Sequence, residues 1–289
     1  QVLRVQRMLG IYFAAILATG IAAGCFGTVI HRMRLPADER LVWLAALIAL
    51  PLQPLTFYCV RVPLDQWLIS YLGSTSTTYA WLKTLYAPLT EEPAKLVPLL
   101  IPAIFRDIRK ENFVRYALAI GVAFAIGEMW FVAECITRVP DLAAMPYYQF
   151  AGYMCERLMT CVFHSAFLSV ALWRLRYGFV PGFAGAVLLH WLGNISVFLM
   201  VWDVGGLGMT FWKTFICVFL PIYLIAAVIL LTCFGYGRFA PQQFFYGPRL
   251  CPECDKLYDA PLLAVNLGRI RYERCPHCQK WHWTRPGTS

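Results

Sequence analysis

Residues 113–135 read FVRYALAIGVAFAIGEMWFVAEC, a stretch of 23 residues in which only three side chains are charged. A membrane-spanning helix needs about 20 predominantly apolar residues, so this segment predicts a helix that crosses a bilayer. Arg115 and Glu134 stand near its ends. The third charge, Glu128, stands a few residues past the centre, where a carboxylate costs roughly 2.5–3.5 kcal/mol on insertion scales.

Other stretches of the same kind follow along the chain, and the composition agrees with them. Hydrophobic residues make up 60% of the 289 residues and charged residues only 14%, against about 45–50% and 25% in an average soluble domain. Pro51 and Pro54 are expected to kink the second stretch, and Pro93 to distort the third. We therefore expect an all-α polytopic membrane protein with about seven transmembrane helices, over residues 8–30, 41–60, 79–104, 113–135, 152–174, 179–201 and 211–235.

The basic residues of the short loops predict the orientation. Loops on one side carry three of them, Arg61, Arg138 and Lys213. The loops after the first, third and fifth stretches, with the start of the tail, carry Arg32, Arg34, Arg40, Arg106, Arg109, Lys110, Arg174, Arg176 and Arg238. Because Lys and Arg collect in cytoplasmic loops, we predict a multi-pass protein of the cell membrane with its N-terminus outside and its C-terminus in the cytoplasm. The net charge of +9 suits a lipid bilayer, and no nucleic-acid partner is expected.

Five ionisable residues fall within four of the predicted spans. They are Glu91 and Glu92 in the third, Glu128 in the fourth, His164 in the fifth and His190 in the sixth. Such residues are rare inside membranes and usually face the bundle interior or a water-filled cavity. Inward-facing polar residues on neighbouring helices are also how bundle proteins build metal and active sites. The sequence therefore predicts that the five meet in one functional centre.

Local spacings suggest the partners of these residues. Lys95 stands one helical turn after Glu91, so an i,i+4 ion pair is expected, and Glu92 is left without an evident partner. Asn194 stands one turn after His190, where it could orient a ligand, hydrogen-bond a reacting oxygen or satisfy a helix contact. Arg157 follows Glu156 near the end of a span and suggests a simple surface pair.

Four short motifs, taken in order over about residues 80–200, resemble the motif series of the PrsW intramembrane proteases: Glu91-Glu92-x-x-Lys95, Phe124-x-x-x-Glu128, His164 and His190-x-x-x-Asn194. These proteases belong to a wider group with the CAAX-processing endopeptidases and the bacteriocin-processing membrane proteases. The resemblance implies hydrolysis of a peptide bond in a membrane-anchored protein, such as a regulator of anti-sigma type. It also implies that a carboxylate, with or without a metal ion, activates the water.

The residue types are compatible with that chemistry in two ways. A catalytic zinc site keeps three protein ligands and an open position, and Glu128, His164 and His190 would supply such a set for zinc or another divalent metal. Glu91 or Glu92 would then act as the general base. In a metal-free alternative, glutamate and histidine activate water directly, and His190 with Asn194 stabilises the oxyanion.

Two other classes of membrane protein remain as alternatives. Buried glutamate and histidine residues also form proton and ion pathways, so a transporter is the first of them. A transporter would usually carry an inverted repeat or broken helices in matching halves, and neither is evident in the sequence. A seven-span receptor or scaffold is the second, although it gives the paired glutamates and the histidines no role.

The tail carries a separate metal signature, which divides the chain into a helical protease core over residues 1–238 and a cytoplasmic domain over residues 239–289. Two CxxC pairs with twenty intervening residues have zinc-ribbon spacing, and they consist of Cys251, Cys254, Cys275 and Cys278. Four thiolates close a tetrahedral structural zinc site, with iron as the chief competitor. His277 and His282 are not needed as ligands and are expected at the surface. Trp281 and Trp283 could rest on the membrane interface or contact a partner.

Overall fold

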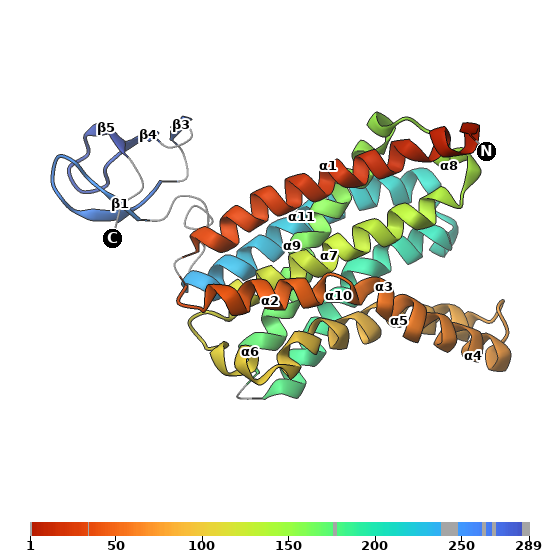
Figure 1. The fold of residues 1–289 in the computed structure, drawn as a ribbon. Coiled ribbons are helices and arrows are strands. Elements are labelled where there is room, and N and C mark those ends of the chain that lie inside the picture. Colours follow the sequence, from red (N-terminus) through yellow and green to blue (C-terminus); the bar gives the residue numbers. More distant parts are fainter. Residues whose placement is uncertain are drawn as a thin grey trace.

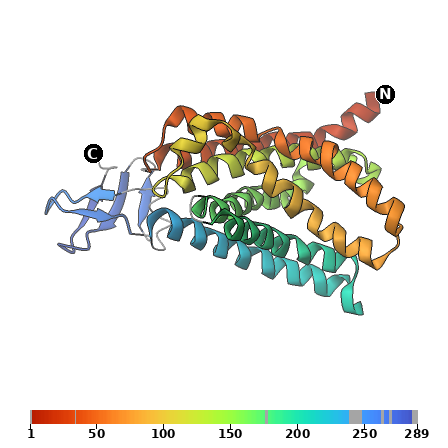
Figure 2. The same ribbon diagram turned by 90° about the horizontal axis from the view of Figure 1, so that it is seen from below.

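The structure, a computed structural model, describes residues 2–33, 35–175, 178–237, 248–261, 264–267 and 270–284. Long helices occupy the chain up to Tyr236, and short strands begin at Pro248 (Figure 1). The boundary predicted at residues 238–239 falls between these helices and strands, outside the described residues. Figure 2 shows the long helices running side by side, with the small sheets beyond one end of them.

Six helical segments in the described residues are long and apolar enough to cross a membrane. This confirms the prediction of a helical membrane protein, with six such segments instead of about seven. They contain α1 (Val2–Arg32), α2 to α4 as one unit, α7 (Phe113–Thr137), α9 (Ala151–Trp173), α10 (Phe179–Val201) and α11 (Met209–Tyr236).

The second of these segments is built from several pieces. Asp38 caps its first helix by accepting a hydrogen bond from the Arg40 backbone N–H at 2.9 Å. Pro51 interrupts the ladder after Leu50, as expected of a proline without an N–H group. The pieces are α2 (Glu39–Ala49), α3 (Leu52–Thr56), the π-helical η1 (Phe57–Arg61) and α4 (Val62–Leu72). The predicted kink is thus confirmed, and the π-helical turn ends on Arg61, which lies at the candidate site.

The third predicted span, residues 79–104, accounts for the difference in number. It forms α5 (Thr77–Lys95), the 3-10 turn η2 (Val97–Leu100) and α6 (Pro102–Asp107) instead of one continuous helix. Pro88 and Pro93 lie inside α5, and three ionisable residues stand in its last turns. The segment therefore fails as a continuous apolar helix. The segment still runs between the two ends of the bundle, because α4, which precedes it, lies at one end and α6 lies near the other (Figure 1).

The two ends of the bundle hold different termini. The N-terminus lies at one end, while α11 runs towards the other, where the small sheets lie (Figure 1). Gly237 ends α11 in the left-handed conformation with φ 68°, the usual helix stop. The connections at the N-terminal end contain three short helices, α8 (Pro140–Ala143), η3 (Tyr147–Phe150) and η4 (Val204–Gly206). Termini at opposite ends agree with the predicted topology, whereas its sidedness stays a prediction.

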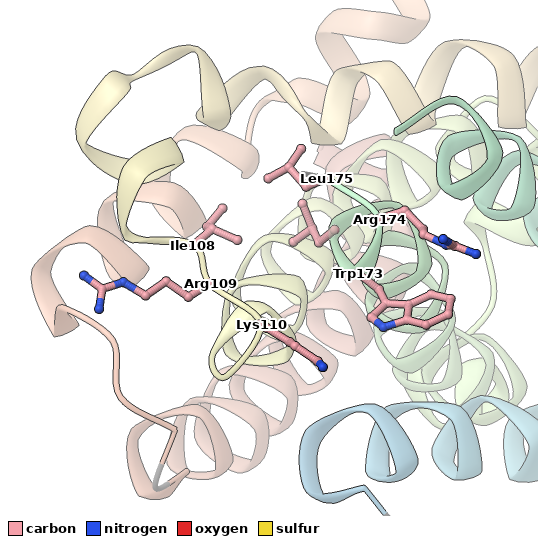
Figure 3. Close-up of a pocket in the computed structure, with 7 residues that line it drawn as sticks. Ile108, Arg109, Lys110, Trp173, Arg174 and Leu175 are labelled. Atoms are coloured by element: carbon pink, nitrogen blue, oxygen red, sulfur yellow. The ribbon is translucent and has the colours of Figure 1, made fainter. Parts of the chain in front are cut away.

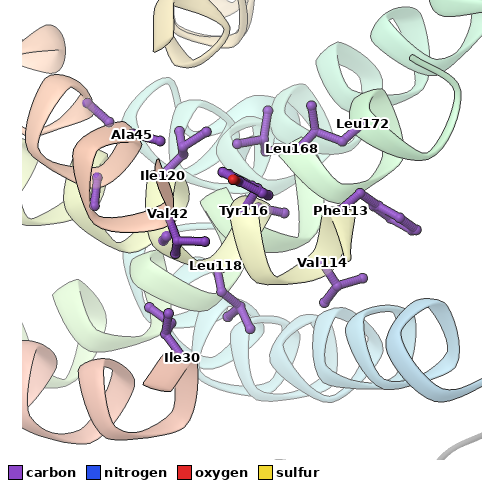
Figure 4. Close-up of a cluster of buried hydrophobic side chains, with 14 of the residues drawn as sticks. Ile30, Val42, Ala45, Phe113, Val114, Tyr116, Leu118, Ile120, Leu168 and Leu172 are labelled. Carbon is purple, nitrogen blue, oxygen red and sulfur yellow. The ribbon is translucent and has the colours of Figure 1, made fainter. Parts of the chain in front are cut away.

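Helix α7 forms the centre of the bundle. Its residues 113–125 are buried without interruption, because α1, α2 and α9 pack around it. Figure 4 shows side chains of the main apolar cluster, which α7 shares with α1, α2 and α9. A helix that is apolar all round is expected in such a buried position. Helix α7 therefore serves as the core of the helical part.

One glycine allows a close contact between α7 and α9. A Cβ atom added to Gly121 of α7 would lie 2.5 Å from the backbone nitrogen of Ser165 in α9. Small residues let helix backbones approach each other within membranes. Because His164 precedes Ser165, this approach brings His164 within reach of the side chains that follow Gly121 on α7.

The tail folds into two small antiparallel sheets. β1 (Pro248–Leu250) pairs with β2 (Leu257–Asp259), and the second sheet has the order β3 (Val265–Leu267), β4 (Ile270–Arg274), β5 (Trp281–Thr284). Cys251 and Cys254 lie in the loop between β1 and β2, and Cys275 and Cys278 lie in the loop between β4 and β5. The two loops bring all four cysteines together, as the predicted ribbon requires.

Candidate functional site

The ionisable residues predicted to converge do lie together. Glu91 and Glu92 come from the last turns of α5, Glu128 from α7, His164 from α9 and His190 from α10. All are buried except Glu128, which is partly buried. The rings of the two histidines lie 5.3 Å apart, nearly perpendicular to each other.

Each histidine is held by a carboxylate from another helix. His164 Nε2 lies 2.7 Å from Glu128 Oε2, and His190 Nδ1 lies 2.6 Å from Glu92 Oε1. An ionised carboxylate only accepts hydrogen bonds, so the ring nitrogen that faces it carries the proton. The other nitrogen of each ring is then left with a free lone pair. This arrangement is the one in which histidine serves as a metal ligand or a base.

Glu91 is the carboxylate that faces the free nitrogen of His190. Its Oε2 lies 3.7 Å from His190 Nε2, and its Oε1 accepts a hydrogen bond of 2.8 Å from Arg61 of η1. One ligand atom each from Glu91, His164 and His190 lies within 4.8 Å of the others. The structure therefore groups Glu91 with the two histidines, where the sequence had predicted Glu128. A ligand role for Glu128 stays a prediction, since its carboxylate contacts His164.

The donor set of Glu91, His164 and His190 fits a divalent metal. Two imidazoles and one carboxylate are the ligand types of catalytic zinc sites. His164 Nδ1 is also buried without a hydrogen-bond partner, as is Glu92 Oε2. A buried polar atom without a partner costs free energy of folding. A bound group that contacts His164 Nδ1 would remove this cost.

Lys95 differs from its predicted pairing. The expected i,i+4 pair with Glu91 is wrong, because Lys95 Nζ bonds Glu92 Oε1 at 2.5 Å, three residues away. Lys95 is fully buried, and its ammonium group lies over the rings of Phe124 and Phe167 at 5.3 and 5.8 Å. The reason is the rotation of α5, which turns Glu91 towards η1 and Glu92 towards α10. Lys95 thus neutralises the carboxylate that orients His190.

Arg157 also differs from its prediction. It was expected in a surface pair with Glu156, but it is buried and bonds both Glu156 and Glu128, the latter at 2.8 Å. Arg61 and Arg157 together neutralise two of the site carboxylates. Sequence reasoning missed both arginines, because each stands near the predicted end of an apolar stretch. Arg61 and Arg157 are each paired with a carboxylate from a helix that is distant in the sequence.

The site opens into a cavity of about 550 Å³ between the spanning helices. Asn194 lines it, one turn from His190 as predicted. Its other polar lining residues include Glu91, Glu128, His164, His190, Arg61 and Arg157. Apolar side chains such as Phe131, Phe163 and Val197 complete the wall. Glu92 is not among the lining residues, because it lies behind His190 against Lys95. The volume is within the usual range of ligand-binding pockets.

A second cavity, of about 200 Å³, lies between the loop before α7 and the end of α9. Figure 3 shows Ile108, Arg109 and Lys110 on one side of it and Trp173 and Arg174 on the other. Its described lining residues are basic and apolar, with no carboxylate or histidine among them. Among the described residues, the types needed for hydrolysis are therefore found at the first cavity and not at this one.

The four cysteines of the tail have the geometry of a metal site. Cys251 Sγ lies 3.6 Å from Cys278 Sγ, and Cys254 Sγ lies 3.8 Å from Cys275 Sγ. Zinc–sulfur bonds of about 2.3 Å in a tetrahedral site place the sulfur atoms about 3.8 Å apart. The observed sulfur–sulfur distances therefore fit tetrahedral coordination of one ion. All four thiols are free, which excludes disulfide bonds among them in this structure. Burial raises the pKa of Cys275, but backbone hydrogen bonds from Cys278 and His277 outweigh this effect and lower the pKa to about 6. The lowered pKa favours the thiolate, which is the form that binds metal.

His282 is a further correction. It was expected at the surface, but it is buried, and its Nε2 lies 3.1 Å from the Tyr258 hydroxyl. Alternate residues of a strand point to opposite faces, so β5 turns His282 inward while Trp281 and Trp283 point outward. His277 is exposed, as predicted.

No protein-family model, no curated protein and no solved structure matches this chain.

Proposed function

We propose that the protein is an intramembrane protease that hydrolyses a peptide bond in a membrane-anchored protein. The observation that carries this proposal is the buried group of Glu91, His164 and His190 at a cavity between spanning helices. A carboxylate beside two oriented imidazoles is the equipment for activating water. The resemblance of the motifs to PrsW-type proteases supports the same reaction class.

Within this proposal, the two adjacent glutamates have different roles. Glu91 lines the cavity and is the general base, which accepts a proton from the attacking water. Glu92 is a positioning residue: it fixes the His190 tautomer through Nδ1 and is itself neutralised by Lys95. Glu128 likewise fixes the tautomer of His164, through the contact with its Nε2. Asn194 lines the cavity one turn from His190, and its side-chain amide can donate a hydrogen bond to the oxyanion that forms as water adds to the carbonyl.

The same residues are compatible with a divalent metal, held by the two histidines and by either Glu91 or Glu128. A bound metal would polarise the carbonyl and lower the pKa of the water. The cavity carboxylate that is not a ligand would then take the proton. We do not assign that task to Glu92, because it lies behind His190 and does not line the cavity.

The test is a search for new protein termini. Membranes from cells that express the wild type or Glu91→Gln are compared by quantitative terminal proteomics, with the exposed-site variant Lys83→Gln as control. We expect termini in membrane-anchored proteins that the wild type and Lys83→Gln produce and Glu91→Gln does not. The best candidate is then cleaved by purified protein in H₂¹⁸O, and ¹⁸O appears in the new carboxylate. Equal cleavage by Glu91→Gln would overturn the proposal.

A proton- or ion-coupled transporter is the second candidate. One observation favours it: one buried ion pair (Lys95–Glu92) and two partly buried ones (Arg61–Glu91 and Arg157–Glu128) lie at the site where α5 ends and the third predicted span is broken. Broken helices and paired charges are common in transporter sites. Proteoliposomes loaded with a pH-sensitive dye separate the candidates. Glu91-dependent proton or cation flux without any cleavage would favour the transporter.

A further inference from the structure

The larger sheet of the tail has its polar residues inside and its aromatic residues outside. Along β4 and β5, the buried positions are Arg271, Glu273, His282 and Thr284. The outward positions are Tyr272, Arg274, Trp281 and Trp283. Sheets that cover a core normally show the opposite alternation, with apolar residues inside.

The polar interior is internally bonded and does not need those aromatic residues. Tyr258 donates to Glu273 Oε1 at 2.9 Å, and Thr284 donates to the same oxygen at 2.7 Å. Arg271 forms an ion pair of 2.9 Å with Glu273 Oε2. These contacts and the four cysteines form the interior of the tail, and the outer aromatic residues take no part in either.

The outer face is a continuous aromatic surface. Tyr272 lies opposite Trp283 in the strand register and stacks on Trp281 with ring centroids 5.4 Å apart. Val265 of β3 lies opposite Tyr272 and extends the surface. Trp281, Trp283 and Val265 are 56%, 49% and 57% exposed, so no described part of the chain covers them. Arg274, opposite Trp281, adds a positive charge at the edge.

The membrane is close enough to be the occupant. Helix α11 is one of the candidate spans and ends at Tyr236, so the tail begins at a bilayer surface. Residues 237–247 separate Tyr236 from β1, and eleven residues extend at most about 40 Å. Trp and Tyr are the residues of the headgroup region. Residues 248–289 carry seven Lys or Arg against four Asp or Glu, a formal net charge of +3. A divalent ion bound by four thiolates would reduce this charge to +1, which still favours anionic lipid.

We infer that this outer face, made of Val265, Tyr272, Arg274, Trp281 and Trp283, is a membrane-docking surface. Its occupant is the headgroup region of the same bilayer that holds the helices. The ring bodies enter the boundary with the acyl chains, while Arg274 stays among the phosphates. Docking holds the ribbon flat at one end of the helical part. This inference is independent of the proposed function of the intramembrane site.

Fluorescence quenching in lipid nanodiscs tests the inference. The full chain is placed in phosphatidylcholine nanodiscs with added phosphatidylglycerol, with bromine atoms either near the headgroup end or near the tail end of the acyl chains. The contribution of the two tryptophans is the difference between wild type and Trp281→Ser/Trp283→Ser. The matched control is Leu250→Ser/Leu257→Ser, an exposed facing pair on the other sheet of the tail. Metal content of each variant verifies that its ribbon is folded.

We expect the difference signal to be quenched more by bromine near the headgroups than by deep bromine, and to be shielded from aqueous acrylamide. The control variant should show the quenching of the wild type. Free access of acrylamide to the difference signal, with no effect of brominated lipid, would overturn the inference. Shielding that occurs only in native membranes, and not in nanodiscs of pure lipid, would assign the face to a protein partner and would overturn it as well.

Discussion

At the scale of single residues, the structure separates two neighbours that look alike in the sequence. Glu91 faces the cavity and Arg61, whereas Glu92 lies behind His190 against Lys95. Successive residues of a helix point about 100° apart, so the rotation of α5 decides which glutamate faces the cavity. That rotation depends on packing against α10, which the sequence does not give. The pair could be predicted from the sequence, but the division of roles could not.

The substitution Glu91→Gln should abolish catalysis and leave the fold intact. Loss of a general base lowers the rate by about 10²–10⁴-fold. The Arg61 guanidinium that it leaves unpaired is partly exposed and can be solvated. Cleavage of the identified substrate and the thermal midpoint in nanodiscs measure the two effects. Lys83→Gln should change neither, and a large drop in the midpoint for Glu91→Gln would contradict the role assigned to this residue.

The substitution Glu92→Gln should act mainly on stability. It leaves the Lys95 ammonium buried without a negative partner, and breaking a buried pair costs about 3–5 kcal/mol. Removing both charges in Glu92→Gln/Lys95→Met should restore much of that loss, because replacement of a buried pair by apolar groups is often neutral. Denaturant unfolding in nanodiscs compares the three proteins. A double variant no more stable than the single one would show that the ion pair is not the cause.

At the scale of elements, hydropathy is a local property, and this is why most spans could be predicted. The apolar runs around α7, α9, α10 and α11 carry their own signal, and the prolines of the second segment mark its breaks. The third segment was counted as a full span, but its ionisable residues and prolines end the helix at Lys95. The burial of Arg157 could not be predicted, because its partner Glu128 belongs to another helix.

The contact between α7 and α9 offers a prediction at this scale. Gly121→Ala would place a methyl group 2.5 Å from the Ser165 backbone nitrogen. Separation of the helices should cost about 1–3 kcal/mol of stability, as overpacking does, and should weaken the His164–Glu128 hydrogen bond. Unfolding and cleavage assays measure both effects.

The matched control for this prediction is Gly24→Ala on α1. Nothing within 4 Å would meet its added methyl group, so the helix should gain about 0.5–1 kcal/mol from the replacement of glycine. Equal behaviour of the two variants would mean that close packing at Gly121 does not position His164.

At the scale of the whole molecule, the chain contains two groups of residues that could hold a metal ion, and their surroundings differ. The four cysteines lie in a tail with little apolar core, so a bound metal should drive its folding. Glu91, His164 and His190 lie within a helical part that has a large apolar core of its own. The sequence predicted the four cysteines and the two histidines, but it named Glu128 instead of Glu91 as the third ligand, and it could not give the cavity that the second group lines.

The two groups should be separable by counting metal. We expect two divalent ions per wild-type chain, one in the Cys251→Ser/Cys275→Ser variant and one in His164→Ala/His190→Ala, measured by elemental analysis of purified protein in nanodiscs. The cysteine variant should keep cleavage activity, since its metal is structural and its helical part folds through its own core. The histidine variant should lose activity and keep a folded ribbon. A cysteine variant that contains no metal and still cleaves its substrate would rule out a catalytic metal and leave Glu91 and the histidines to activate water directly.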